Sequence, residues 1–187
     1  MRTFIAIELP AEIKRAIAAL QDDLRHARAE VSWTKPENIH LTLKFLGEIE
    51  EQLVSQIAQA CVETAQAFTS FTLSINGAGA FPNARQPRVL WVGLGDGVEE
   101  ARRVQDHLDE RLAAIGFERE ARAFHPHLTI GRIKSPQGTQ ALMARAEAYH
   151  LPILSFVARE LVFMHSQLHP AGARYTPLAK AQFSAQS

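Results

Sequence analysis

The sequence contains one four-residue pattern twice: a histidine followed by leucine, threonine and an aliphatic residue. The first copy, HLTL, occupies residues 40–43, and the second, HLTI, occupies residues 127–130. Each copy follows an apolar stretch and then a helical pattern, and these preceding segments have nearly the same length in the two halves of the chain. Phe4 lies 36 positions before the first histidine, and Leu90 lies 37 positions before the second. The sequence therefore predicts two successive β-α-β units of equal length, and this internal repeat constrains the fold more than any other feature.

The periodicity of the apolar residues predicts the individual elements. Ile13, Ile17 and Leu20 recur at helical spacing after the first apolar run. Runs rich in β-branched and aromatic residues, bounded by proline and glycine, predict strands. The predicted elements are strand 3–9, helix 11–30, strand 40–47, helix 51–68, strand 71–75, a loop over 76–87, strand 88–94, helix 98–116, strand 127–133, helix 138–150 and a long strand 155–166.

The length of the chain limits the number of domains, and its charge limits the class of binding partner. We predict one domain over residues 1–187, built of two pseudo-symmetric lobes at about 1–84 and 85–187, with some exchange of strands. The net charge is zero, which argues against a basic coat for gripping duplex DNA. The first half has 7 basic and 10 acidic side chains and the second has 13 and 10, so a local basic patch in the second half is possible.

The cysteine, histidine and hydropathy patterns bear on the cellular compartment of the protein and on whether it binds a metal. Cys61 is the single cysteine and falls on the apolar face of a predicted helix, so we expect a buried side chain. No acidic ligand accompanies the histidines of HPH at 125–127 or HSQLH at 165–169, which predicts no metal site. No apolar run approaches the roughly 18 residues that a membrane span requires. The N-terminal apolar stretch is too short for a signal peptide, so a cytoplasmic protein is expected.

The repeated motif is suited to proton transfer at a phosphate group. Side chains alternate across a strand, so His40 and Thr42 share one face, and His127 and Thr129 share another. If the lobes are related by an approximate two-fold axis, both pairs face one cleft. Histidine has an ordinary pKa near ~6.5, so one ring can be neutral while the other is protonated. The hydroxyls can donate hydrogen bonds to the oxygens of a phosphate, which predicts phosphodiester chemistry without a metal.

Other side chains near the motifs are candidates for substrate contacts. Arg132 lies on the opposite face from His127 in a regular strand, but a bulge at Gly131 would return it to the cleft. Tyr175 lies in a polar segment rich in proline and glycine, where its ring could stack on a base. There are other basic and aromatic candidates, for which a solvated charge or core packing is the favoured explanation. They are Lys35, Lys44, Arg122, Lys134, Trp33, Phe45, Phe81 and Phe124.

Three longer stretches carry a resemblance to a known family. They are PENIHLTLKFLGEI at 36–49, FHPHLTIGRIK at 124–134 and HSQLHPAGARYTPL at 165–178. They resemble the 2'-5' RNA ligase family, also described as RNA 2',3'-cyclic phosphodiesterases, of the two-histidine (2H) phosphoesterase superfamily. The likeness spans nearly the whole chain. It implies a bilobed α+β fold of duplicated units, in which antiparallel sheets line a central cleft and helices lie outside.

The resemblance also implies an activity. This is hydrolysis of a 2',3'-cyclic phosphate at the 3' end of RNA to a 2'-phosphate, with His40 as proton donor to the leaving 3'-oxygen and His127 as the proton acceptor that activates water. Joining of RNA ends through a 2'-5' linkage is the associated reaction, and hydrolysis is expected to dominate in water. The expected partner is RNA with 2',3'-cyclic phosphate ends, fragments of transfer RNA included. No cofactor, metal, membrane or obligate protein partner is expected.

The substrate-binding candidates are Thr42, Thr129, Arg132 and Tyr175. The sequence departs from the family pattern at His125, where relatives often have arginine, and at Gly131, where a small residue such as alanine is common. Two alternatives stay open. The same residues could act on a small cyclic or 2'-5'-linked nucleotide, or they could hold an RNA end without turnover. A pure binding module would more naturally use arginine and lysine, which stay charged near neutral pH.

Overall fold

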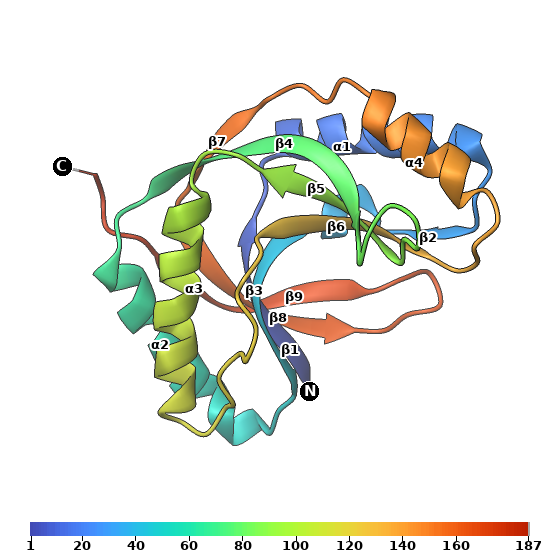
Figure 1. The fold of residues 1–187 in the computed structure, drawn as a ribbon. Coiled ribbons are helices and arrows are strands. Elements are labelled where there is room, and N and C mark those ends of the chain that lie inside the picture. The colour runs from blue at the N-terminus through green and yellow to red at the C-terminus, as the bar shows by residue number, and fades with distance from the viewer. Residues whose placement is uncertain (187) are drawn as a thin grey trace.

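Two antiparallel β-sheets form the centre of the computed structural model, which describes residues 1–186 (Figure 1). The first sheet has the strand order β3-β1-β8-β9, and the second has the order β2-β6-β5-β4-β7. Every strand pairing within these sheets is antiparallel. The strands are β1 (Arg2–Glu8), β2 (Val31–Trp33), β3 (His40–Glu48), β4 (Phe71–Phe81), β5 (Val89–Leu94), β6 (His127–Ile133), β7 (Ser155–Ala158), β8 (Glu160–Gln167) and β9 (Arg174–Gln182).

Four α-helices lie in two pairs on the outside of the sheets (Figure 1). α1 lies beside α4, where Arg145 forms an ion pair with Asp23 at 3.0 Å. α2 lies beside α3 and packs on β8 and β9. The predicted fold class is therefore confirmed. The helices are α1 (Ala11–Leu24), α2 (Val54–Ala67), α3 (Val98–Ala113) and α4 (Thr139–Ala148), and three 3₁₀ turns are η1 (Arg25–Ala27), η2 (Pro36–Asn38) and η3 (Glu51–Leu53).

The two β-α-β units are interlocked. The last strands of the chain, β8 and β9, complete the sheet that contains β1 and β3, while β4 from the first half pairs with β5 from the second. Helices of each half also make polar contacts with strands of the other half. Gln21 of α1 donates through Nε2 to the carbonyl of Ile130 in β6 at 2.9 Å, and Asp109 of α3 accepts from Lys44 of β3 at 2.6 Å. Each sheet thus takes elements from both halves of the sequence, and the lobe boundary near residue 84 stays a prediction.

One main hydrophobic cluster joins the sheets to the helices. It includes the aliphatic residues of both motifs, with Leu41, Leu128 and Ile130 each fully buried and Leu43 at 3% exposure. Cys61 belongs to the same cluster at 1% exposure, as its helical position predicts. None of the helices in residues 1–186 has the length and apolarity needed to span a membrane.

Two predicted strands have different limits in the structure. β4 continues through Phe81, so much of the predicted loop 76–87 is strand. A register shift between Ile75 and Ala78 interrupts the alternation there, which explains why the pattern did not predict it. The predicted strand 155–166 is two strands, because the chain leaves the second sheet after β7 and joins the first sheet as β8.

Two strands were missed entirely. The predicted helix 11–30 ends at Leu24, and after the 3₁₀ turn Arg28 adopts a left-handed φ of 54°, which turns the chain into β2. β9 contains Pro177 and many exposed residues, so its sequence lacks the pattern of a buried strand. It pairs only with β8, and proline is tolerated in such edge strands.

Candidate active site

A cavity of about 1000 Å³ is lined by strands of both sheets and contains both copies of the repeated motif. The first copy enters from β3 and the second from β6. The cavity brings together every site residue that the sequence predicted. These are His40, Thr42, His127, Thr129, Arg132 and Tyr175.

The two motif strands share one irregularity. The register of β3 against β1 skips Leu43, and the register of β6 against β5 skips Ile130, the corresponding residue. The extra residue reverses the alternation beyond it, so Phe45 and Arg132, each five positions after its histidine, line the same cavity as the histidines. The bulge suggested at Gly131 is therefore present one residue earlier in β6.

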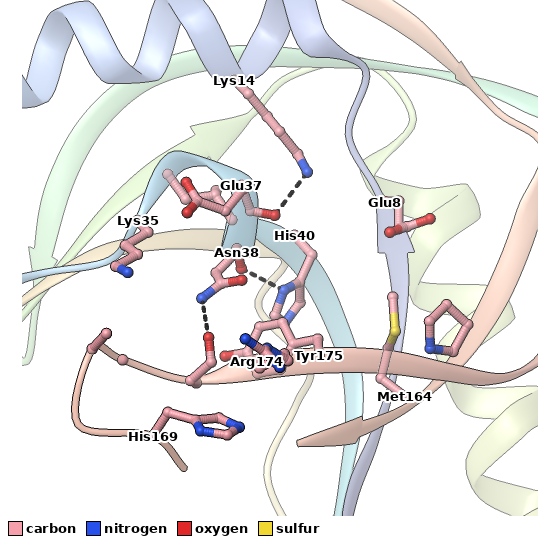
Figure 2. Close-up of a pocket in the computed structure, with 15 residues that line it drawn as sticks. Glu8, Lys14, Lys35, Glu37, Asn38, His40, Met164, His169, Arg174 and Tyr175 are labelled. Carbon is pink, nitrogen blue, oxygen red and sulfur yellow. Dashed lines mark hydrogen bonds between the residues drawn. The ribbon is translucent and has the colours of Figure 1, made fainter. Parts of the chain in front are cut away.

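His40 is held by one hydrogen bond and two rings. Its Nδ1 lies 2.7 Å from the carbonyl oxygen of Asn38 (Figure 2). A carbonyl only accepts, so Nδ1 carries the hydrogen and Nε2 is left to exchange a proton. The ring stacks on Phe4 with centroids 4.6 Å apart and planes at 16°, and the ring of Tyr175 is nearly perpendicular to it, with centroids 5.4 Å apart. These contacts fix both the tautomer and the plane of the ring.

His127 repeats this arrangement in the second unit. Its Nδ1 lies 2.7 Å from the carbonyl oxygen of His125, again two residues back, so Nε2 is again the free nitrogen. Phe81 meets the ring at 90° with centroids 4.9 Å apart, and Trp91 lies 5.4 Å behind Phe81. A Cβ atom at Gly79 would lie 2.5 Å from the indole, so this glycine makes room for the ring that backs Phe81.

Burial makes His40 a weak base in the unliganded cavity. It lowers the pKa of His40 from 6.5 to about 4; the hydrogen bond to Asn38 raises the pKa and the charge of Lys14 lowers it further. His40 is therefore neutral at pH 7 when no anion lies beside it.

The remaining predicted residues surround the two imidazoles. Thr42 and Thr129 lie on the same strands as the histidines and face the cavity. Arg132 is exposed at the end of β6. Burial raises the pKa of the Tyr175 phenol, while the charges of Arg2 and Arg132 act in the opposite direction. These two guanidinium groups therefore lie close enough to Tyr175 to act on an anion bound beside it.

Several cavity residues were missed by the sequence reasoning. Arg2, Phe4 and Arg88 line the cavity with the predicted Arg122. Arg2 and Phe4 belong to β1, and they reach the site because β1 is the hydrogen-bonded neighbour of β3. A search for the partner strand of the first motif would have pointed to them. Together the arginines give the cavity a positive rim, and Glu120 is also part of the lining.

Lys44 is not the RNA-guiding or solvated charge that the sequence suggested. Its side chain is 5% exposed, and Nζ lies 2.6 Å from Asp109, 3.2 Å from Glu120 and 2.7 Å from the carbonyl oxygen of Glu118. Asp109 also accepts from the backbone N–H of Glu120 at 2.9 Å. The side chain is buried because the bulge turns Lys44 inward. Its ion pair and hydrogen bonds link the segment before the second motif to β3 and α3.

The other flanking candidates divide into three groups. Phe45, Phe81, Phe124 and Arg122 line the cavity. Lys35 lines a neighbouring pocket. Trp33 lies under the guanidinium of Arg25 at 5.2 Å, and Lys134 follows β6 outside the part of residues 1–186 that lines the cavity.

The histidines outside the motifs form no metal cluster in the described part of the chain. Within residues 1–186, no group of three or more His, Cys, Asp and Glu side chains could hold a metal ion. His125 lines the cavity and supplies its carbonyl to His127, while His169 lines the neighbouring pocket.

Comparison with known families gives one match for each unit. A family model described as LigT like Phosphoesterase matches residues 7–91 and, separately, residues 92–175. Each matched segment contains one copy of the histidine motif.

Curated relatives and solved structures agree with this match. An RNA 2',3'-cyclic phosphodiesterase of Methanothermobacter thermautotrophicus is 35% identical over 179 residues, covering 95% of this chain and 96% of the relative. One from Thermotoga maritima is 34% identical over 184 residues, covering 98% and 96%. A crystal structure from Thermus thermophilus has a TM-score of 0.81 at 27% identity and covers 100% of both chains. Escherichia coli LigT complexed with 3'-AMP has a TM-score of 0.77 at 28% identity and covers 98% of each chain.

Proposed function

The chain belongs to the LigT-like phosphoesterase family, and from that membership we propose that it hydrolyses the 2',3'-cyclic phosphate at the 3' end of RNA to a 2'-phosphate. The observation that carries this proposal is the pair of imidazoles from matching strands, which line one cavity with the same nitrogen free. In-line displacement at phosphorus needs a base for the attacking water and an acid for the departing oxygen. Two histidines can supply both functions without a metal.

In the proposed reaction, the bond between phosphorus and O3' breaks as the water oxygen bonds to phosphorus. Nε2 of His127 takes a proton from that water, and Nε2 of His40 gives its proton to O3'. The products are a 2'-phosphate and a free 3'-hydroxyl. A 5'-hydroxyl of a second RNA in place of water would form a 2'-5' linkage by the same steps.

His40 must be protonated when the substrate is bound, although it is neutral in the unliganded cavity. The substrate supplies the reason for the change. A phosphate anion about 4 Å from the ring favours the imidazolium by roughly 4 kcal/mol at an effective dielectric constant of about 20, which corresponds to about three pKa units. We therefore expect bound substrate to raise the pKa of His40 toward neutrality, so that the proton donor forms in the complex.

The surrounding side chains fit the charge and shape of this substrate. The hydroxyls of Thr42 and Thr129 can donate to the non-bridging oxygens, where charge builds in the transition state. Arg132 supplies a charge that does not titrate. Phe45 is 64% exposed at the cavity and offers a flat surface on which a base can stack.

One experiment distinguishes this function from its competitors. The protein is incubated with EDTA and an oligoribonucleotide ending in a 2',3'-cyclic phosphate, and the product is identified. A 2'-phosphate is expected. A 3'-phosphate would overturn the assigned proton donor and leaving group. Binding without turnover would identify an RNA-end-binding module, and turnover of mononucleotides alone would identify a small-nucleotide enzyme.

Substitution of either motif histidine tests the assigned roles. We expect His40→Ala and His127→Ala each to lower kcat by at least ~10²-fold with the fold preserved, because each removes one proton-transfer group. His150→Ala is the matched control, since this histidine is exposed after α4, and its kcat should be unchanged. Retention of full activity by either motif variant would remove that residue from the mechanism.

A further inference from the structure

A second pocket, of about 450 Å³, adjoins the active-site cavity (Figure 2). It is bounded by the N-terminal part of α1, the segment that leads into β3 and the connection between β8 and β9. Four residues line both spaces, so the two spaces adjoin each other on either side of these residues. These shared residues are Asn38, His40, Ala173 and Tyr175.

Hydrogen bonds hold the residues between the two spaces in place. Asn38 donates through Nδ2 to the carbonyl oxygen of Ala173 at 2.8 Å, which ties the connection between β8 and β9 to the motif strand. The carbonyl of the same Asn38 accepts from His40 at 2.7 Å. One residue therefore orients the imidazole and also fixes the edge of the second pocket.

The second pocket has an excess of unpaired positive charge. Lys14, Lys35 and Arg174 point toward it, as Figure 2 shows. Within residues 1–186, no carboxylate oxygen lies within 4.0 Å of these three side chains. Lys14 donates instead to the backbone carbonyl of Glu37 at 3.0 Å. The lining has two acidic residues: Glu8 is paired with Lys180 at 3.7 Å, and Glu37 remains as one carboxylate against the three cations, so the pocket has a net positive charge suited to an anion.

The position of His40 indicates how a bound RNA strand would run through the site. If His40 protonates O3', the terminal ribose lies against its ring on the cavity side. The strand continues from C5' of that ribose through a phosphodiester to the preceding nucleotide. We propose that the second pocket binds this preceding phosphodiester, so that the protein acts on RNA chains in preference to mononucleotides. This role depends on the proposed function and deepens it by assigning a binding site to the phosphodiester that precedes the terminal nucleotide.

A phosphodiester bound in the second pocket would also change the electrostatic environment of His40. The charge of Lys14 is one of the influences that lower the pKa of His40. A phosphodiester beside Lys14 offsets that charge, so a bound strand favours the protonated form of His40. Chain binding and formation of the proton donor are therefore coupled through one lysine.

The test compares two substrates in the same protein. One is a nucleoside 2',3'-cyclic phosphate, and the other is an oligoribonucleotide with the same terminal nucleotide. We expect Lys35→Met with Arg174→Met to lower the ratio of kcat/KM for the oligonucleotide to that for the mononucleotide by about tenfold, mainly through KM, because charge-assisted phosphate contacts are lost. The salt dependence of oligonucleotide binding should also become shallower.

Lys134→Met is the matched control, because it removes an exposed lysine after β6 that lines neither space. Its ratio should equal that of the wild type. An unchanged ratio in the double variant, or an equal loss on both substrates, would overturn the binding role of the pocket while the hydrolysis itself stands. Absence of turnover of both substrates by the wild type would refute the proposed function, and the binding role with it.

Discussion

His40 and His127 make the same hydrogen bond but have different surroundings. His40 is stacked on Phe4 and lies beside Tyr175, whereas the ring of His127 is perpendicular to that of Phe81. Burial lowers the pKa of the stacked His40 ring. Identical motifs can therefore serve different steps, because the neighbouring strands supply each ring with its own environment.

We expect an NMR titration to give His40 a pKa of about 4 in the free protein and a higher pKa with a nucleoside 2'-phosphate bound. The low value also makes stability depend on pH. The unfolded chain binds a proton at this residue near pH 6.5, while the folded protein leaves it neutral down to about pH 4. Acidification through this window therefore lowers the free energy of unfolding, by about 3 kcal/mol in total.

His40→Gln should remove this part of the acid sensitivity, as measured by denaturant unfolding at pH 7 and pH 4.5. A free-protein pKa near the ordinary value, or equal acid sensitivity in wild type and variant, would contradict the burial of the ring.

The sequence was informative about some site residues and silent about others for a physical reason. His40 and Thr42 could be assigned to one face because alternation along a single strand is a local property. Arg2 and Phe4 could not be assigned, since they reach the cavity only through the pairing of β1 with β3. Lys44 was misjudged because a bulge, invisible in the alternation, turns it into the interior.

At the scale of elements, each of the two bulges is a place where a helix of one half contacts a strand of the other half. The carbonyl of Ile130, the extra residue in β6, accepts from Gln21 of α1 at 2.9 Å and from the backbone N–H of Thr34 at 3.0 Å. Next to the corresponding bulge in β3, Lys44 binds Asp109 of α3. A bulge leaves a backbone or side-chain group without its ladder partner, and in both strands a helix from the other unit supplies the contact.

We expect Lys44→Met to lower the free energy of unfolding by about 3 kcal/mol, because it removes the short ion pair at 2.6 Å and leaves the buried Asp109 carboxylate with the longer ion pair to Arg119 at 3.6 Å. The double variant with Asp109→Leu should lose less than the sum of the two single variants, which a double-mutant cycle in urea would measure. Lys180→Met is the control, since its pairs with Glu160 and Glu8 are at the surface and their loss should cost less than ~1 kcal/mol. Additive losses in the cycle would show that the two side chains are not coupled.

At the scale of the whole molecule, the exchange of strands and helices makes each half depend on the other. Without residues 85–187, β1 would lose its neighbour β8, and the outer side of β3 would lose α3. An exposed β1 that is apolar over most of its length would favour aggregation over folding.

We expect the fragments 1–84 and 85–187 each to remain unfolded in isolation, seen as poor dispersion in NMR spectra, because neither contains a complete sheet. Mixing them should restore dispersion and cyclic phosphodiesterase activity together. A cooperatively folded isolated fragment would show that the lobes are independent domains.

The order of elements was largely predictable, whereas their partners were not. Strands 3–9 and 40–47 and the helix over residues 98–116 carry strong local patterns and are present with nearly these limits. β9 and the second half of β4 lack such patterns and are held as strands by their neighbours. The split of residues 155–166 between two sheets depends on tertiary structure alone. The repeat predicted two lobes and a cleft between them only on the assumption of a two-fold axis, and the family resemblance supplied the antiparallel sheets that line it.

The carbonyls of Asn38 and His125, which hold both imidazoles in one tautomer, have a consequence for successive catalytic cycles. After one hydrolysis by the proposed route, His127 carries the hydrogen that the water lost and His40 has given its own away. His40 is then in its resting neutral form, but His127 must lose this hydrogen to solvent, and His40 must gain a hydrogen with the next substrate, before the enzyme can react again. A turnover rate that rises with buffer concentration would reveal this recovery step, and a rate indifferent to buffer would place the slow step elsewhere.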